Sequence, residues 1–477
     1  MIRMVLLILL FGASFGPAWG EEAASMVVEP CDLPGVPPAL APRLTCGTVA
    51  VPRAYDSPAS GTFRLAVVLI KTASPHKLDD PVVYITGGPG SPLTIKAALL
   101  ASHEAGVVAP DRDLILVDQR GAGRSEPALC PGLAASQLAI FAAGADQRTL
   151  VGQWRDSFAA CRREMDQRGL RPEWFGTQIT AKDIDSVRQA LGVERWNVYA
   201  LSYGTAVATT MMALHPQSLR AVVLDSVFPP EPMPLTQQQT FDRALDRLFA
   251  ACKRQAACDA AHPDLRAIYA EAMRGLDAAP LAVTLAPDLQ PRVMTLRSEV
   301  FRLIVDRALY SRAGMASLPA LIAAARDRNA ASMADALSRA ARAYAASSAG
   351  IVAAVECRDR PGWHDAKPSD GTPVSFYVPG MCEGWGPVGP PPLLASDPDV
   401  PVLLLSGAID PITPPEFAAM ASAALGPRAR LVEFAEVGHG AQQATPCGES
   451  IVSSFIRDPA KLVDARCAPS IAPVTYR

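Results

Sequence analysis

Ser202 is the residue of this chain that is best placed to do chemistry. It lies in the decapeptide Trp-Asn-Val-Tyr-Ala-Leu-Ser-Tyr-Gly-Thr, where Trp196–Ala200 predicts a buried strand and Thr205–Leu214 has the spacing of a helix. A serine at a sharp strand-to-helix turn is exposed, and it becomes a nucleophile when a base and oxyanion donors lie nearby. Ala200 and Gly204 are small enough to let strand and helix pack closely. The alternative is a tight turn of a Rossmann-like protein, with Ser202 capping the helix.

His439 is the histidine best placed to act as the base. It follows a predicted strand in the sequence Glu-Val-Gly-His-Gly, and the flanking glycines let a loop hold the imidazole at the edge of a sheet. The alternative is a solvent-exposed loop histidine. The other five histidines lie in loops, in a predicted surface helix or at helix ends that histidine commonly caps: His76, His103, His215, His262 and His364.

An acidic residue must orient that imidazole and stabilise its cation. Asp410 follows the predicted strand Pro401–Ser406 among turn residues, and His439 follows the next strand. Because ligands and active sites gather at the carboxyl ends of parallel strands, we expect both side chains on one rim of the sheet. The competitor is Asp225, at the end of the predicted strand Ala221–Leu224. Turn residues surround Asp410, which favours it.

Two backbone N–H groups are the expected donors to an oxyanion formed at Ser202. One is that of Tyr203, directly after the nucleophile. The other comes from the sequence Gly-Gly-Pro-Gly, in which Pro89 has no N–H; Gly88 is the first choice and Gly87 the second. The alternatives are a plain glycine turn and a nucleotide-phosphate loop, and the sequence motif that such a loop requires does not follow.

The composition is that of a folded protein, and its charge gives no electrostatic reason to expect binding to nucleic acid. Of the 477 residues, 49% are hydrophobic, which is enough for a core and argues against global disorder. The formal net charge is −3, and lysine and arginine are scattered, so we expect no nucleic-acid partner. No motif requires a cofactor or a metal, and we expect neither.

Residues 1–20 predict a secretory signal peptide. Arg3 supplies a positive charge, Val5–Phe11 is an apolar stretch too short to span a bilayer comfortably, and Ala18-Trp19-Gly20 has small residues where a signal peptidase cleaves. The alternative is an uncleaved anchor. We therefore expect a periplasmic or secreted protein without stable membrane insertion after cleavage.

Ten cysteines in an exported chain favour disulfide bonds. Metal binding is the alternative, but Cys252 and Cys258 are too far apart for a Cys-x-x-Cys knuckle and no histidine cluster accompanies them. We hypothesise that neighbouring cysteines pair, because sequential pairs lie in the same local segment. The resulting pairs are Cys31–Cys46, Cys130–Cys161, Cys252–Cys258, Cys357–Cys382 and Cys447–Cys467.

Short apolar strands alternate with helical stretches, which predicts an α/β fold with a mostly parallel sheet between helices. Further strands are expected at 47–51, 63–71, 81–86, 114–117 and 429–434, and a helix at 181–191. Amphipathic patterns instead predict helices at 241–254, 265–276, 297–310 and 332–345. The expected organisation is a signal peptide at 1–20, a sheet domain formed by 21–228 and 396–477, and a helical insertion at 229–395.

Four motifs occur in a fixed order: Gly87-Gly88-Pro89-Gly90, Asp118-Gln119-Arg120-Gly121 with Gly123-Arg124-Ser125, Leu201-Ser202-Tyr203-Gly204-Thr205 and Gly438-His439-Gly440. Together they resemble the proline iminopeptidase and tripeptidyl aminopeptidase family of α/β-hydrolases. The segment Cys46-Gly47-Thr48-Val49 and the tail from Pro401, with its two cysteines, resemble the exported tripeptidyl aminopeptidase branch. Thr86 replaces the histidine of plain proline iminopeptidases, which argues against strict N-terminal proline specificity, and Ala200 replaces a glycine.

The resemblance implies an α/β-hydrolase with an inserted helical cap. It implies an exported serine aminopeptidase that hydrolyses peptides from their free N-terminus through an acyl-enzyme on Ser202. Such caps carry acidic groups for the substrate ammonium, and Glu356 and Asp359 lie where related chains have a Cys-x-Asp element. The alternative for these two is a solvated or salt-bridged pair. The alternative functions are a carboxylesterase or lipase with the same triad, and a hydrolase-like protein that only binds.

Overall fold

A nine-stranded sheet forms the centre of the computed structural model, which describes residues 25–102, 110–229, 235–361, 380–396 and 398–476. The strands are β1 (Val27–Glu29), β2 (Leu44–Pro52), β3 (Thr62–Ile70), β4 (Val82–Ile85), β5 (Leu114–Val117), β6 (Trp196–Leu201), β7 (Leu219–Asp225), β10 (Val402–Gly407) and β11 (Ala429–Phe434). Their spatial order is β1-β2-β3-β5-β4-β6-β7-β10-β11. The pairs from β1 to β5 are antiparallel, and all pairs from β5 to β11 are parallel.

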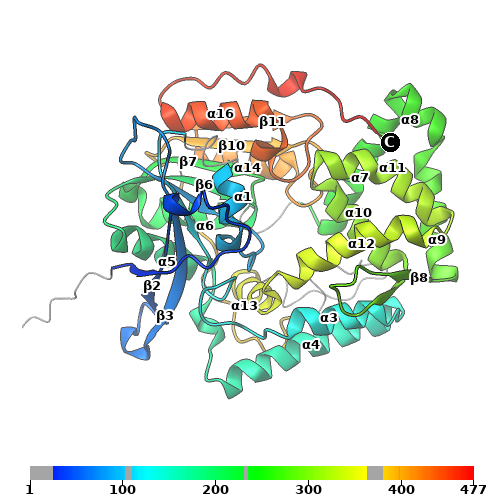
Figure 1. Ribbon diagram of the computed structural model, residues 1–477, viewed down its shortest axis with the longest axis horizontal. Helices are drawn as coiled ribbons and strands as arrows, with labels where there is room; N and C mark the ends of the chain where they lie inside the picture. The colour runs from blue at the N-terminus through cyan, green and yellow to red at the C-terminus, as the bar shows by residue number, and fades with distance from the viewer. Residues whose placement is uncertain (1–24, 103–109, 230–234, 362–379, 397, 477) are drawn as a thin grey trace, which may run out of the picture.

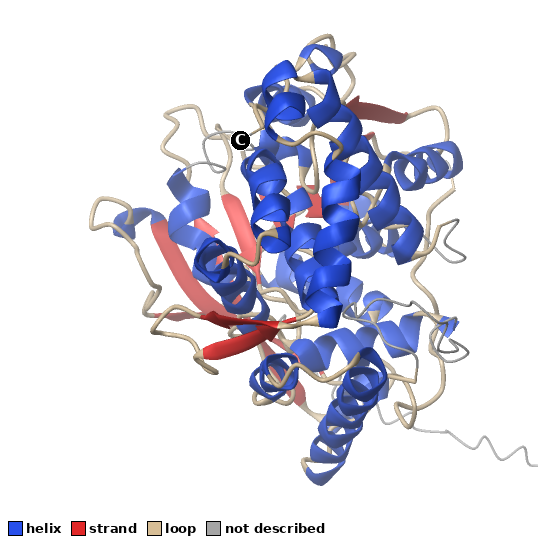
Figure 2. Ribbon diagram, turned by 90° about the vertical axis from the view of Figure 1, so that its right-hand side faces the viewer, coloured by secondary structure: helices blue, strands red, loops and turns tan. Residues whose placement is uncertain are grey.

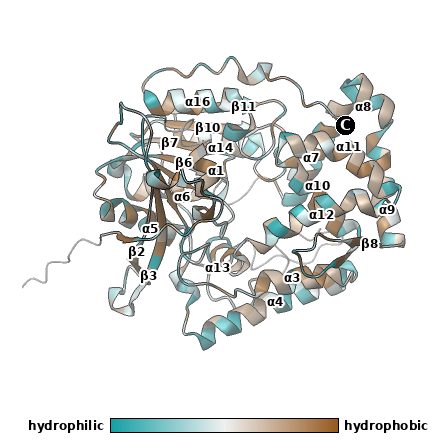
Figure 3. Cartoon of the chain, viewed as in Figure 1, coloured by the Kyte–Doolittle hydropathy of each residue, from teal (hydrophilic) through white to brown (hydrophobic). Residues whose placement is uncertain are grey.

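The central strands are continuous apolar runs because helices cover both faces of the sheet. Successive residues of β6 point to opposite faces: Val198 joins one buried apolar cluster and Tyr199 the other. The covering helices include α1 (Ala97–Ser102), α5 (Thr177–Ala190), α6 (Tyr203–Leu214), α14 (Pro415–Leu425), α15 (Ala441–Ala444) and α16 (Pro446–Arg457). Figure 3 shows that the strands of the sheet are mainly hydrophobic (brown), whereas the surrounding helices also carry hydrophilic residues (teal).

Between β7 and β10 the chain leaves the sheet and forms a largely helical region. Its elements are α7 (Gln237–Arg254), α8 (Ala256–Ala261), α9 (Leu265–Ala278), the hairpin β8 (Leu281–Thr284) and β9 (Val293–Leu296), α10 (Ser298–Leu309), α11 (Arg312–Arg326), α12 (Ala330–Ala345) and α13 (Ala349–Asp359). The four helices expected from the sequence correspond to α7, α9, α10 and α12. We call the elements from α7 to α13 the cap; they lie beside the sheet in Figure 1.

Two helices between β5 and β6 pack against the cap. These are α3 (Leu133–Ala142) and α4 (Gln147–Gln167), and they contact α12, α13 and β9. The sequence-based division placed them in the sheet domain. Figure 1 shows them beside cap helix α12 and away from most of the sheet. Figure 2 shows, from the side, the red strands of the sheet among the blue helices.

The structure joins the ten cysteines in five pairs of neighbours, with Cα atoms 5.1 to 5.9 Å apart. The pairs are the same five as those hypothesised from the sequence. No helix in the described ranges is both long and apolar enough to cross a bilayer. The predicted signal peptide lies outside the described residues, as do His103 and His364.

Candidate active site

Ser202 lies at a strained turn between β6 and α6. Its backbone has φ 58° and ψ −127°, a conformation that non-glycine residues rarely adopt. The turn is tight enough that a Cβ at Gly204 would lie 2.3 Å from the carbonyl oxygen of Ile85. The Ser202 N–H donates to the carbonyl of Asp225 at 2.9 Å, and its side chain makes no capping hydrogen bond to α6. The hydroxyl is therefore displayed at the turn rather than used as a helix cap.

Asp410 and His439 form a hydrogen-bonded pair. The distance from His439 Nδ1 to Asp410 Oδ2 is 2.8 Å, and the side chains are 7% and 0% exposed. Asp410 also accepts from the N–H groups of Ile412 and Thr413, at 2.8 and 2.9 Å, and from the Thr413 hydroxyl at 2.7 Å. Burial opposes ionisation, but the charge of His439 and these hydrogen bonds outweigh it and hold the pKa of Asp410 below its ordinary value. The carboxylate can thus orient the imidazole as an anion.

The loop that carries His439 packs on β10 and on the cap. A Cβ at Gly407 would lie 2.1 Å from the Gly438 carbonyl oxygen, and one at Gly438 would lie 2.0 Å from that of Leu309. The His439 N–H donates to the Tyr310 carbonyl at 3.0 Å, and the two rings lie 4.7 Å apart. The end of cap helix α10 therefore helps to hold the imidazole.

Asp225, the competing carboxylate, holds the backbone after His439 and does not bind its ring. It is fully buried and accepts from the Tyr199 hydroxyl and from the N–H groups of Ala441 and Gln442, each at 2.8 Å. The neighbouring Ser226 hydroxyl accepts from the Gly440 N–H at 2.7 Å. Burial raises the pKa of Asp225 despite these hydrogen bonds. Because its carbonyl also binds the Ser202 N–H, Asp225 connects both loops.

Both residues predicted to donate to an oxyanion lie near Ser202: Tyr203 follows it directly, and Gly88 lines the same cavity. Tyr203 is the first residue of α6, so its N–H has no partner within the helix. A Cβ at Gly87 would lie 2.6 Å from the Ser202 Cβ, so the glycine segment passes directly over the serine. Gly88 follows at φ +115°, which favours glycine. Neither the Gly88 N–H nor the Tyr203 N–H donates a hydrogen bond within the described residues.

The motif that begins at Asp118 supports this glycine segment. Asp118 accepts from the N–H groups of Leu93 and Thr94 at 2.6 and 2.9 Å, and from the Thr94 hydroxyl at 2.7 Å. Arg120 forms a buried ion pair with Asp183 of α5 at 2.5 Å. These residues fix the loops around the site and do not line the cavity between the sheet and the cap.

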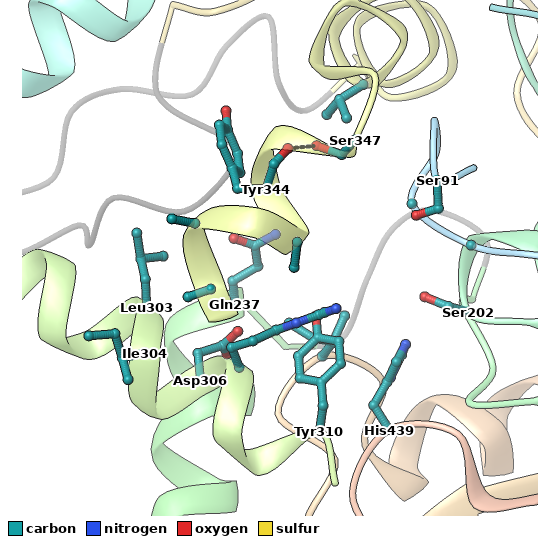
Figure 4. Close-up of a pocket in the computed structure, with 18 of the residues that line it drawn as sticks. Ser91, Ser202, Gln237, Leu303, Ile304, Asp306, Tyr310, Tyr344, Ser347 and His439 are labelled. Carbon is teal, nitrogen blue, oxygen red and sulfur yellow. Dashed lines mark hydrogen bonds between the residues drawn. The ribbon is translucent and has the colours of Figure 1, made fainter. Parts of the chain in front are cut away.

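Ser202 and His439 both line a cavity of about 380 Å³ between the sheet and the cap. In Figure 4 they lie at one end, with the imidazole pointing toward the serine, and Asp306 lies on the α10 side beside Tyr310. Most of the wall is apolar and comes from α3, α4, α10 and α12, including Leu138, Phe141, Trp154, Leu337 and Tyr344. Such a chamber suits a substrate with apolar groups next to the reacting bond.

Asp306 is an acidic group of this cavity that the sequence analysis missed. It is partly exposed, and within the described ranges no hydrogen bond or ion pair involves its carboxylate. Burial raises its pKa to about 6, against the charges of Arg302 and Arg307. Its only sequence signal is a carboxylate on the amphipathic α10, which is common on solvated helix faces.

Glu356 and Asp359 do not line this cavity, although they were expected to bind the substrate ammonium. Both are 2% exposed. Glu356 pairs with Arg360 at 2.8 Å, and Asp359 accepts from the N–H and the hydroxyl of Thr177. Their surroundings are those of a buried polar network, so the ion-paired alternative describes Glu356 better than ammonium binding does.

Two other histidines occur where the sequence placed them, at helix ends. His215 ends α6 and His262 ends α8. Neither lines the cavity, and no group of three or more His, Cys, Asp or Glu residues that could hold a metal ion occurs in the described part of the chain.

A model of the alpha/beta hydrolase fold family matches residues 80–443, which is more than half of the chain. The chain belongs to the α/β-hydrolase fold family. The predicted fold class is thereby confirmed.

Among its curated relatives, this hydrolase is 29% identical to the tripeptidyl aminopeptidase of Streptomyces coelicolor over 213 residues, which are 42% of this chain and 38% of that protein. It is 30% identical to serine protease Hip1 of Mycobacterium tuberculosis over 224 residues (45% and 42%). It is 26% identical to the proline iminopeptidase of Neisseria gonorrhoeae over 150 residues (31% and 33%). The resemblance seen in the motifs is thus confirmed, and the matches span less than half the length of these relatives.

A solved proline iminopeptidase of Mycobacterium smegmatis aligns with 86% of this hydrolase and 97% of its own chain, at 16% identity and a TM-score of 0.39. An esterase of Thermogutta terrifontis aligns with 86% and 97%, at 16% identity and a TM-score of 0.37.

Proposed function

We propose that this hydrolase is an exported serine aminopeptidase, which cleaves peptides from their free N-terminus through an acyl-enzyme on Ser202. The observation that carries the proposal is the cavity shared by Ser202, the Asp410-bound His439 and the carboxylate of Asp306, which has no ion pair among the described residues. The peptidase names of the relatives support the same class.

The chemistry would begin with attack of the Ser202 hydroxyl oxygen on the scissile carbonyl. His439 takes the serine proton as the C–O bond forms, while Asp410 stabilises the imidazolium. The N–H groups of Tyr203 and Gly88 bind the oxyanion, each worth on the order of 3 kcal/mol. His439 then gives its proton to the leaving amine, and the C–N bond breaks. Water, activated by the same imidazole, hydrolyses the acyl-enzyme and restores the serine.

Asp306 is the residue that we propose as the acceptor of the substrate ammonium, in place of Glu356 and Asp359. It lies in the same cavity as the nucleophile, and no described residue pairs with its carboxylate, whereas Glu356 and Asp359 belong to a buried polar network. A carboxylate in a partly desolvated chamber attracts an ammonium more strongly than one in water. This would select peptides with an unblocked N-terminus.

Export is part of the proposal because of the cysteines. Five disulfides form among the described residues, and they persist in oxidising compartments such as the periplasm or the extracellular space. The composition of residues 1–20 supports removal of a signal peptide during export.

The test compares three substrates: a tripeptide nitroanilide with a free amine, the same compound acetylated, and a nitrophenyl ester. We expect the free-amine peptide to be cleaved best, and Ser202→Ala to lose at least about a thousandfold of this activity. Mass spectrometry of products from unblocked peptides then counts the residues released per cut. Near-normal turnover by pure S202A would overturn the assignment of the nucleophile.

The same assay decides against the second candidate, a carboxylesterase. The largely apolar wall of the cavity favours this alternative, because an ester with an apolar acyl group would fit it. Ester turnover without cleavage of any free-amine peptide would establish the esterase and exclude the aminopeptidase.

A further inference from the structure

A chain of buried hydroxyl groups connects the cap to the residue after Ser202. The Tyr203 hydroxyl lies 2.9 Å from Thr177 Oγ1. Thr177 in turn donates to one carboxylate oxygen of Asp359, from its hydroxyl at 2.5 Å and from its N–H at 2.9 Å. All three residues are buried. They come from three elements: Tyr203 begins α6, Thr177 begins α5, and Asp359 ends cap helix α13.

The donors and acceptors fix a direction along this chain. A threonine hydroxyl has one proton, and Thr177 uses it toward the carboxylate of Asp359. The Tyr203 hydroxyl must then donate to Thr177. The carboxylate of Asp359 is thus the terminal acceptor of a network whose other end is Tyr203, the residue whose N–H is the proposed oxyanion donor.

The carboxylate of Asp359 is only partly satisfied by hydrogen bonds, which is unfavourable for stability. Its second oxygen, Oδ1, is buried and has no hydrogen-bond partner in the described part of the chain. The adjacent arginine, Arg360, is paired with Glu356 at 2.8 Å and lies 4.2 Å from the Phe228 ring. A half-satisfied buried carboxylate is unfavourable, and in a native protein it calls for a functional explanation. Asp359 does not line the cavity, so substrate contact is not that explanation.

We propose that Asp359 is a positioning residue that, through Thr177, fixes Tyr203 and its oxyanion-binding N–H when helix α13 is seated on the sheet domain. The inference rests on the proposed hydrolysis at Ser202. It makes the oxyanion site depend on the position of the cap, since a shift of α13 would remove the acceptor at the end of the chain.

The charge of Asp359 adds a pH dependence. Burial raises its pKa to about 7, opposed by the hydrogen bonds from Thr177 and by Arg360 and assisted by Glu356. Tyr203 faces it from α6 and stays neutral, because burial raises the Tyr203 pKa well above its ordinary value. Asp359 therefore gains a proton as the pH falls through about 7, and Thr177 then loses a charged acceptor.

The test begins with Asp359→Asn, which is neutral at every pH. We expect kcat at pH 8 to fall about tenfold, for both a peptide and an ester, with KM changed less than about threefold, because a displaced N–H weakens only transition-state binding. In the wild type, kcat should fall on the acid side with one more protonation than in D359N, that of Asp359. The acid limb of D359N should lack this protonation.

Stability separates positioning from a merely structural role. The folded-state pKa of Asp359 lies above its unfolded value. The contribution of Asp359 to the stability of the wild type therefore falls as the pH rises from about 4 to about 7, and D359N lacks this pH-dependent contribution. As the pH is raised from 5 to 8, the melting temperature of D359N should therefore rise relative to that of the wild type. The kcat of D359N should nevertheless be the lower of the two. A structural residue would instead lose stability and activity together at pH 8.

Substitutions of Thr177 test the same bond from its other side. Thr177→Val should reproduce the fall in kcat, and Thr177→Ser should restore most of it. Thr209→Val is the matched control. Thr209, on α6, is buried like Thr177, but among the described residues its hydroxyl donates to the Ala206 carbonyl of its own helix and not to the Asp359 network. If D359N does not fold, this series decides the question.

The inference is overturned if D359N and T177V keep wild-type kcat and pH profiles, or if T177S fails like T177V. It is also overturned if D359N is less stable than the wild type at pH 8. The activity of S202A is measured first: its retention would refute the proposed nucleophile, whereas its loss together with normal D359N refutes only the role of Asp359.

Discussion

Four buried or partly buried aspartates near this site differ in what surrounds them, and those surroundings assign their roles. Asp410 receives an imidazole and three hydrogen bonds, which keep it ionised. Asp225 accepts from two backbone N–H groups and from the Tyr199 and Ser226 hydroxyls, and it orders a loop. Asp306 has no partner of its own among the described residues and faces the cavity, whereas Asp359 ends a hydroxyl chain. Residue type alone could not separate them.

The first prediction contrasts Asp410 with Asp225. Asp410→Asn should lower kcat about 10³- to 10⁴-fold with a nearly unchanged melting temperature, because an amide cannot stabilise the imidazolium or fix its tautomer. Asp225→Asn should lower kcat less and cost about 1–3 kcal/mol of stability, since it leaves a buried backbone N–H without an acceptor. Steady-state kinetics and thermal melts of both variants check this. The larger loss of kcat in D225N would reverse the assignment of the two carboxylates.

The second prediction concerns the pH dependence of substrate binding through Asp306. Its pKa of about 6 means that it is ionised at neutral pH and loses its charge as the pH falls through 6. KM for a free-amine peptide should therefore rise below pH 6, approaching about tenfold per pH unit. The acetylated peptide should show no such rise. Asp306→Asn should raise KM for the free-amine peptide at neutral pH and abolish its pH dependence, and an unchanged KM in D306N would place the ammonium elsewhere.

At the scale of elements, the sequence predicted the sheet better than the cap. Strands β5 and β11 were located to the residue. For β5 the reason is that a short apolar run between turn residues is compatible with few other structures. Helix α4 was missed although Leu150, Trp154, Phe158 and Cys161 follow helical spacing and are buried. The short hairpin β8–β9 carries too little pattern to be seen. We propose that the functional cap includes α3 and α4 as well as α7 to α13.

For the candidate site too, the residues of the sheet domain were easier to predict from the sequence than those of the cap. Ser202, Asp410 and His439 each lie in the turn or loop that follows a parallel strand, so the order of motifs along the sheet was enough to bring them to one edge. The cap residues depend on how helices of an insertion pack, and no local pattern encodes that packing. Glu356 and Asp359 were therefore expected in the cavity, and Asp306 was not noticed.

The third prediction tests how tightly β10 and the histidine loop are packed. Gly407→Ala would put a Cβ 2.1 Å from the Gly438 carbonyl and 2.5 Å from that of Val437, both rigid backbone atoms. We expect a loss of about 1–3 kcal/mol in stability and of at least about tenfold in kcat, because the loop must move to accommodate the methyl group. Gly275→Ala in α9 is the control, since no atom lies within 4 Å of its added methyl group, and it should be neutral or stabilising. Full activity in G407A would show that the loop is not held in this way.

At the scale of the whole molecule, the cap is fastened to the sheet domain at several points far apart in the sequence. The Arg312 side chain donates to the carbonyls of Glu436, before the histidine loop, and of Ala472, in the C-terminal tail. The Val474 N–H donates to the Glu436 carboxylate at 2.7 Å, and the Val474 carbonyl accepts from Gln255. Figure 1 shows the tail running from the sheet side to the cap. A site built from both parts requires such fastening.

The last prediction concerns the disulfides that limit the freedom of these parts. Cys357–Cys382 anchors α13, Cys130–Cys161 joins α4 to the loop before α3, and Cys447–Cys467 holds the start of the tail. Each closes a loop of 20 to 31 residues, and such a bond contributes about 2–4 kcal/mol by restricting the unfolded chain. Reduction should therefore lower the melting temperature and raise KM before activity is lost, because the cap loosens while the sheet persists. Calorimetry with and without reductant, with thiols counted by non-reducing peptide mapping, checks this. An unchanged melting temperature after verified reduction would contradict it, and ten free thiols in the purified protein would remove its basis.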